Sequence, residues 1–139
     1  MPLIQRHVST VSYAAEATIR NYRIIKFGSN DEVVIQATAG SDLFFGVSHL
    51  PLASSDPWPV NQTTAPEILL VAGDTIDIVF GGHPWVEFGA TVARGAPVTS
   101  DEDGRAITAT TGNQVLGFAA IDAVIGDVGP VIIARSVLP

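Results

Sequence analysis

The alternation of apolar and polar positions along the chain predicts an all-β protein. Short runs rich in β-branched and aromatic residues are separated by clusters of Gly, Pro, Asn and Asp, which is the pattern of a β-sandwich or a small β-barrel. Stripes with the period of a helix are nearly absent. The strands expected from this pattern span residues 22–27, 33–37, 44–49, 68–71, 75–80, 115–120 and 131–134.

The breaks between these runs have the chemistry of tight turns, so most connections are expected to be hairpins. Gly, Asn or Asp stands where a positive φ is needed, as in the segments 28–31, 72–74, 103–104 and 126–127. The segment 12–19 differs, because it is rich in alanine but has no helix-capping pair. We interpret residues 1–19 as an N-terminal arm with at most a short helix, and residues 20–139 as a single β domain.

Two motifs recur in the same order, which indicates an internal repeat. Ala-Thr-Ala-Gly at 37–40 is followed by Gly46, and Ala-Thr-Thr-Gly at 109–112 is followed by Gly117. Farther along, Val-Ala-Gly-Asp at 71–74 corresponds to Val-Ile-Gly-Asp at 124–127. We interpret the chain as two related hairpin units that share one core. Independent origin of similar turns is the alternative, and the repeated order argues against it.

A proline-rich segment, residues 51–66, separates the two motifs of the first copy and has no counterpart in the second. It is expected to be a surface loop, and loops longer than about 12 residues are usually functional or disordered. Trp58 lies between Pro57 and Pro59. This side chain could contact a partner or fold back over one end of the barrel, and the sequence leaves both interpretations open.

Charge is distributed unevenly along the chain. The 139 residues have a net charge of −7, yet the first 30 contain four cations and one acid. The acidic remainder disfavours direct nucleic-acid binding, which requires clustered Lys and Arg. The basic segment is a candidate for docking on an acidic protein surface. The candidate partner-binding residues are therefore Arg6, His7, Arg20, Arg23 and Trp58.

Several function classes are excluded by what the sequence lacks. No apolar stretch approaches the ~20 residues that span a bilayer, and the N-terminus has no apolar run of a secretory signal, so a soluble protein made in the cytoplasm is expected. The absence of cysteine excludes disulfides and thiolate chemistry. His7, His49 and His83 are scattered without the spacing of a metal site.

No motif for catalysis or cofactor binding is present either. The sequence contains no Gly-x-Ser-x-Gly elbow and no glycine-rich phosphate loop before a helix. The acidic segment 101–104 lacks the closing glutamate of an EF-hand calcium loop, and we interpret it as the tip of a hairpin. We therefore expect no catalytic residues, no cofactor and no metal.

The second half of the chain carries a resemblance to a known family. A turn and strand at 88–99 are followed by Gly104, Ile107, the 109–112 motif, residues 116–119 and the 126–127 turn. This succession resembles the C-terminal region of the capsid decoration, or cement, proteins of tailed bacteriophages. Residues 23–80 resemble the preceding half, so the similarity covers about residues 20–135 and rests on turn glycines and strand spacing.

The resemblance implies a β-barrel or β-sandwich core and no enzymatic activity. It also implies a homotrimer or another cluster on the exterior of the virion capsid, bound across contacts between major capsid protein subunits. Such a protein would stabilise the expanded shell, because a ligand that binds one state shifts the equilibrium toward that state.

Two other function classes fit parts of the sequence. A small ligand- or carbohydrate-binding barrel could use Trp58 and Trp85 for stacking, and a saccharide-dependent fluorescence change would favour it. Residues 89–98 have the spacing of a biotinyl or lipoyl carrier domain. The single lysine of the chain, Lys26, disfavours the carrier because it lies inside an expected strand and not at a hairpin tip.

Overall fold

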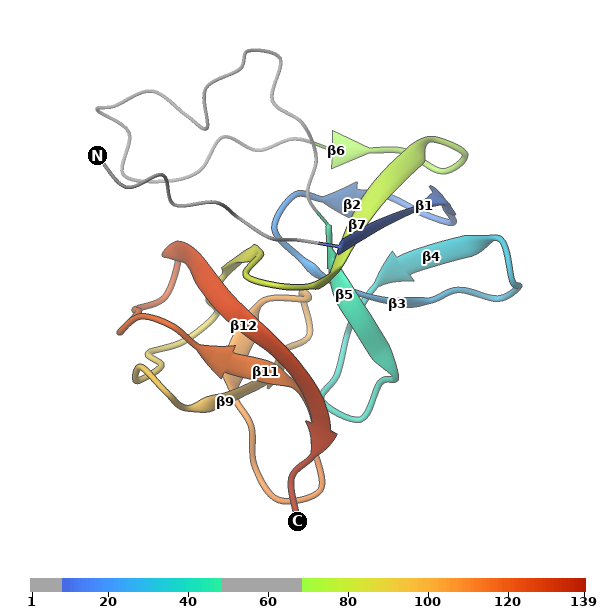
Figure 1. Cartoon of the computed structure of the whole chain (residues 1–139). Helices are drawn as coiled ribbons and strands as arrows, with labels where there is room; N and C mark the ends of the chain where they lie inside the picture. Colours follow the sequence, from blue (N-terminus) through green and yellow to red (C-terminus); the bar gives the residue numbers. More distant parts are fainter. Residues whose placement is uncertain (1–8, 49–68) are drawn as a thin grey trace, which may run out of the picture.

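The computed structural model describes residues 9–48 and 69–139, which form strands, turns and bends without a helix. No described segment is therefore a helix able to cross a membrane. Figure 1 shows two lobes, the first containing β1 to β7 and the second β8 to β12. The strands are β1 (Ser9–Ala15), β2 (Ile19–Arg20), β3 (Ile24–Phe27), β4 (Val33–Gln36), β5 (Phe44–Ser48), β6 (Leu69–Leu70), β7 (Thr75–Gly81), β8 (Trp85–Glu87), β9 (Pro97–Ser100), β10 (Ala106–Thr108), β11 (Gln114–Ala119) and β12 (Val128–Val137).

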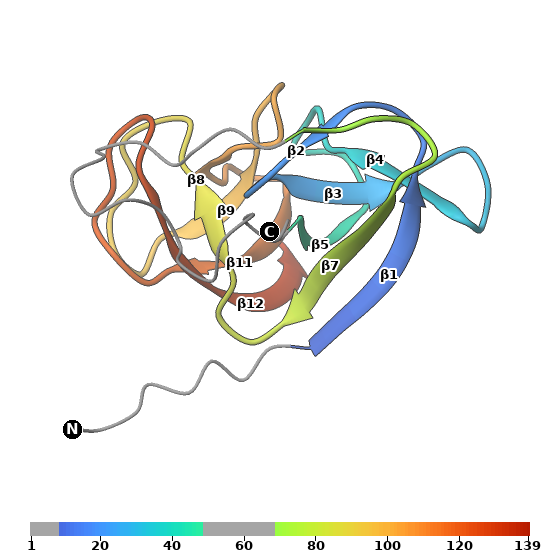
Figure 2. The same ribbon diagram turned by 90° about the horizontal axis from the view of Figure 1, so that it is seen from above.

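The first lobe is a closed barrel with the strand order β1-β4-β3-β5-β7. Strand β1 closes it, because β1 pairs in parallel with β4 on one side and antiparallel with β7 on the other. Figure 2 shows β1 and β7 lying side by side. Strand β7 alternates as an amphipathic strand should, with Ile76 and Ile78 buried and Asp77 exposed between them.

The second lobe repeats this arrangement in the described residues. Its sheet has the order β10-β9-β11-β12-β8. Phe88, which directly follows β8, forms a parallel bridge with Ala106 in β10. This bridge joins the two outer strands, as the parallel pair of β1 and β4 does in the first lobe.

Strand register shows that the two lobes are copies of one fold. The turn motifs are held identically: the Gly73 N–H donates to the Ala15 carbonyl at 2.8 Å, and the Gly126 N–H donates to the Phe88 carbonyl at 2.8 Å. The pairings agree strand by strand, so the repeat predicted from the sequence extends over five strands in each lobe. Equivalent pairs are Ile25–Gly46 and Val98–Gly117, Ile25–Gln36 and Val98–Thr108, Val47–Val79 and Phe118–Ile132, and Ile19–Leu70 and Val92–Ala123.

The lobes have equivalent interiors filled by different side chains. Ala15 in the first lobe corresponds to Phe88 in the second, and Ile76 corresponds to Gly129. The ring of Phe88 lies 3.8 Å from where a Cβ of Gly129 would stand, so the larger ring uses room that the glycine leaves. The first interior consists of Ala15, Ile19, Ile25, Val34, Phe45, Ile76 and Ile78.

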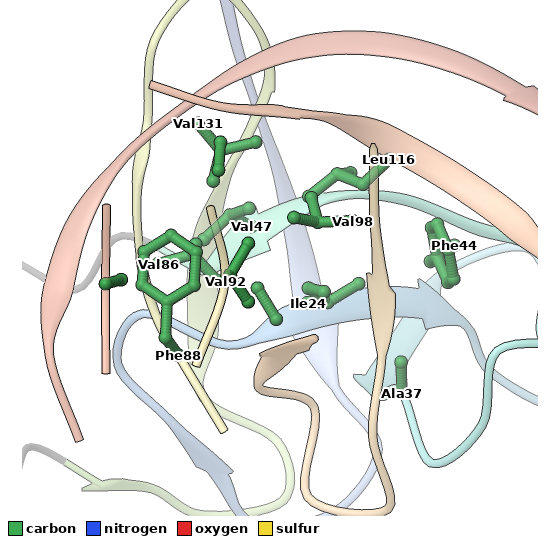
Figure 3. Packing of buried hydrophobic residues seen from close by; sticks show 13 residues of the cluster. Ile24, Ala37, Phe44, Val47, Val86, Phe88, Val92, Val98, Leu116 and Val131 are labelled. Atoms are coloured by element: carbon green, nitrogen blue, oxygen red, sulfur yellow. The ribbon is translucent and has the colours of Figure 1, made fainter. Parts of the chain in front are cut away.

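A second apolar cluster joins the lobes. Ile24, Phe44 and Val47 belong to the first lobe but pack in the cluster that contains Phe88 and Val131 of the second. Figure 3 shows the labelled side chains from β3 and β5 among those of β11 and β12. Burial of these outward-facing residues at the seam stabilises the two lobes against each other.

Each strand expected from the sequence is present in the described residues, with ends moved by a few residues. The expectation for residues 12–19 is wrong, because they form no helix and most of them belong to β1 and β2. Strand β1 takes its backbone partners from β7, more than 60 residues away, so local sequence carries little signal for it. The loop at 51–66 and His49 lie outside the described residues.

Candidate functional site

The candidate docking residues are placed very differently. Arg6, His7 and Trp58 lie outside the described residues. Arg20 is exposed on β2, where its backbone N–H donates to Gln36 Oε1 at 3.2 Å. Among the described candidates, only Arg20 therefore presents its side chain at the surface.

Arg23, by contrast, is part of the seam between the lobes. Its residue is 6% exposed, and Nη2 lies 3.3 Å from Glu87 Oε2 while Nη1 donates to the Asp103 carbonyl at 2.9 Å. Burial lowers the pKa of Arg23, and the charge of Glu87 opposes that effect. A buried, internally bonded guanidinium gives no exposed docking contact, so we remove Arg23 from the set proposed to bind a partner.

The acidic hairpin between β9 and β10 supplies the other half of this seam. Asp101 Oδ1 accepts hydrogen bonds from the backbone N–H groups of Asp103 and Arg105, each at 2.8 Å, and Asp101 Oδ2 lies 3.2 Å from Arg105 Nε. The Gly104 carbonyl accepts from the Ile24 N–H at 2.7 Å. The hairpin tip therefore docks on the first lobe, and no group of three metal-ligating side chains occurs in the described parts of the chain.

A second carboxylate, Asp42, organises the turn before β5. Its Oδ2 accepts from the Thr38 backbone N–H at 2.9 Å and hydroxyl at 3.2 Å, and it lies 3.1 Å from Lys26 Nζ. Burial acts to raise the pKa of Asp42, but the hydrogen bonds from Thr38 and Lys26 outweigh it and lower the pKa. This carboxylate is structural and points to no proton-transfer chemistry.

The outer face of the second lobe carries an exposed apolar pair that sequence reasoning missed. Phe118 and Ile132 are direct cross-strand neighbours in β11 and β12, and each is 42% exposed. Their equivalents in the first lobe, Val47 and Val79, are paired in the same way but are 0% exposed. The internal repeat was the signal that could have located them, because an apolar position that is covered in one copy is open in the other.

These observations describe an all-β structural protein whose ordered polar groups hold its own turns and seam together. Its exposed features are surfaces for contact with other macromolecules. The comparisons with known proteins agree with this class. Residues 4–135 match the family of structural cement proteins described by E217 gp24 and Pam3 gp6, so the chain belongs to the phage structural cement protein family.

The similarity of the fold extends to a solved phage structure. The N base of head fiber gp8.5 of bacteriophage phi29 superposes with a TM-score of 0.61 at 17% sequence identity. The alignment covers 95% of this chain and 98% of that chain, and at this identity it establishes a shared fold. No curated protein matches the chain.

Proposed function

We propose that this protein is a non-enzymatic decoration protein that binds the outer surface of a phage head across contacts between major capsid protein subunits. Binding stabilises the expanded shell, because a ligand that binds only one state of a lattice shifts the equilibrium toward that state. The protein is made in the host cytoplasm and ends on the exterior of the capsid. The observation that carries the proposal is the family match over residues 4–135.

The charge and the polar contacts of the chain support this function. A net charge of −7 keeps the body from binding packaged nucleic acid. Arg23, Asp42 and Asp101 bond within the fold and leave no assembled catalytic group among them. A decoration protein needs contact area and several attachment points, and a homotrimer would supply them through effective concentration.

Four residues form the proposed capsid contact. Arg6, His7 and Arg20 are cations of the basic N-terminal segment, and Trp58 is the aromatic residue of the proline-rich segment. A deletion test has to stop at residue 8, because Ser9 opens β1 and pairs with Gly81 of the barrel. Removal of residues 9–12 would damage the fold and confuse loss of binding with loss of structure.

The test is co-sedimentation with expanded heads that lack this protein. The wild type is expected to pellet with the heads at saturable stoichiometry, and deletion of residues 1–8, Arg20→Glu or Trp58→Ala should lower occupancy while circular dichroism remains unchanged. Glu102→Gln, an exposed position in the β9–β10 hairpin, is the matched control and should bind normally. A folded wild-type protein that stays in the supernatant would overturn the proposal.

A further inference from the structure

The repeated fold leaves one surface covered in the first lobe and open in the second. Val47 and Val79 are fully buried, whereas the equivalent Phe118 and Ile132 are each 42% exposed. We call Phe118 and Ile132 the open face. Both residues are larger than or equal in apolar size to their buried equivalents, so the second lobe exposes a surface that the fold normally covers.

What covers the first lobe beside this surface is the hairpin between β9 and β10. Its tip reaches Ile24 through the Gly104 carbonyl, and Arg23 binds the Asp103 carbonyl at 2.9 Å. A Cβ at Gly104 would lie 2.7 Å from Gln36 Cγ, so the tip fits closely against the first lobe. The seam is thus an acidic hairpin placed on a face with apolar residues and one arginine.

The equivalent hairpin of the first lobe, between β3 and β4, is unoccupied by any described part of the chain. Its tip, residues 28–32, includes the exposed acids Asp31 and Glu32. We call this segment the free hairpin. It projects away from the second lobe in both views (Figures 1 and 2), so it cannot reach the open face of its own chain.

The open face has the charge that suits an acidic hairpin. Pro97 pairs with Phe118, and Arg94 lies in the turn just before this strand. The Gly95 N–H of that turn donates to the carbonyl of Ala119, the residue that follows Phe118. The exposed side chain of Arg94 therefore stands beside the open face, as Arg23 stands beside the covered one.

We propose that the free hairpin of a second copy of this chain docks on the open face, with Asp31 and Glu32 near Arg94. The contact repeats between chains the hairpin-on-lobe packing that joins the two lobes within a chain. It is a head-to-tail contact, and such contacts form rings when the rotation closes. The inference deepens the self-association in the proposed function and is independent of capsid binding.

Two variants of the full chain separate the partners in this contact. The face variant is Phe118→Ser with Ile132→Ser, and the hairpin variant is Asp31→Arg with Glu32→Arg. All four residues are exposed, so both variants should fold, as checked by circular dichroism and thermal unfolding. Ile125→Ser, at an exposed apolar residue in a turn of the second lobe, is the control.

Light scattering after size exclusion gives the readout. The wild type and Ile125→Ser should be oligomeric, and each double variant alone should associate at least tenfold more weakly. A mixture of the two variants should form a one-to-one dimer, because one intact open face meets one intact free hairpin. Arg94→Glu should weaken the wild-type contact and restore association with the hairpin variant.

Three results would overturn the inference. A wild type that stays monomeric at high concentration removes the contact, and co-sedimentation with heads then decides the proposed function separately. An oligomer unaffected by either variant places the self-contact elsewhere. Loss of assembly in both variants without rescue in the mixture indicates a symmetric interface and contradicts the head-to-tail arrangement.

Discussion

Asp42 and Asn113 accept the same hydrogen bonds in the two lobes. Asp42 Oδ2 binds the backbone N–H and hydroxyl of Thr38, and Asn113 Oδ1 binds the backbone N–H and hydroxyl of Thr110 at 2.8 and 3.0 Å. The repeated turn therefore needs a side-chain oxygen but not a charge. In the first lobe the carboxylate adds an ion pair with Lys26.

We predict that Asp42→Asn removes an acid-sensitive part of the stability. The pKa of Asp42 is lowered in the folded protein from its ordinary 3.8. Its contribution is therefore complete above pH 3.8 and is lost as the pH falls through the lower folded value. Denaturant unfolding at pH 7 and pH 3 should show a smaller decrease for Asp42→Asn than for the wild type.

Asp42→Ala is the companion variant, because it removes the acceptor as well as the charge. It should lower the free energy of unfolding at pH 7 by about 1–3 kcal/mol, the range for lost hydrogen bonds to a charged group. The asparagine variant should lose less than the alanine variant. Equal losses would show that the charge, and not the hydrogen-bonded turn, is what matters at this position.

Phe88→Ala is predicted to destabilise the second lobe strongly. Phe88 is fully buried and fills the space beside Gly129. Loss of such a ring typically lowers the free energy of unfolding by about 3–5 kcal/mol, through lost burial and the cavity left behind. Phe80→Ala, at a residue that is 41% exposed, should cost far less in the same urea titration. Similar losses for both variants would refute the packing argument.

Gly117→Ala is predicted to disrupt the pairing of β11 with β12. A Cβ at Gly117 would stand 1.8 Å from the Ile132 carbonyl oxygen, so the strands would have to separate. We expect a loss of about 1–3 kcal/mol or more in chemical unfolding. Gly81→Ala is the matched control, since its Cβ would meet Ser9 at an ordinary 3.5 Å. A Gly117→Ala protein as stable as the control would contradict the register described above.

Glu87→Gln is predicted to weaken the seam between the lobes. The substitution keeps the shape of the side chain but leaves the buried guanidinium of Arg23 without its carboxylate. Unfolding should require about 1–3 kcal/mol less free energy, because a buried charge loses its charged hydrogen-bond partner. Glu102→Gln, which removes an exposed charge from the neighbouring hairpin, should change stability by less than about 0.5 kcal/mol.

The sequence predicted the elements whose signal is local. Ile76 and Ile78 alternate with Asp77, and the glycine turns at 73 and 126 have positive φ, so these strands and turns follow from neighbouring residues. The repeat was visible for the same reason, since its motifs are the turns themselves. Its extent over five strands in each lobe appeared only with the strand register.

The missed features depend on residues far apart in the chain. Strand β1 exists because β4 and β7 pair with it on both sides. Arg23 is buried because Glu87, 64 residues away, neutralises it at the seam. Tyr22 has a φ of 60° where the second lobe has Gly95 at 88°, a conformation that tyrosine rarely adopts and that no local pattern predicts.

The thermal stability of the phage shell tests the proposed function most directly. Expanded heads that lack this protein would be heated with and without saturating wild-type protein, and rupture followed by release of packaged DNA. The account predicts a higher rupture temperature for decorated expanded heads and no binding to unexpanded shells. An unchanged rupture temperature with the protein bound at full occupancy would contradict the cement function.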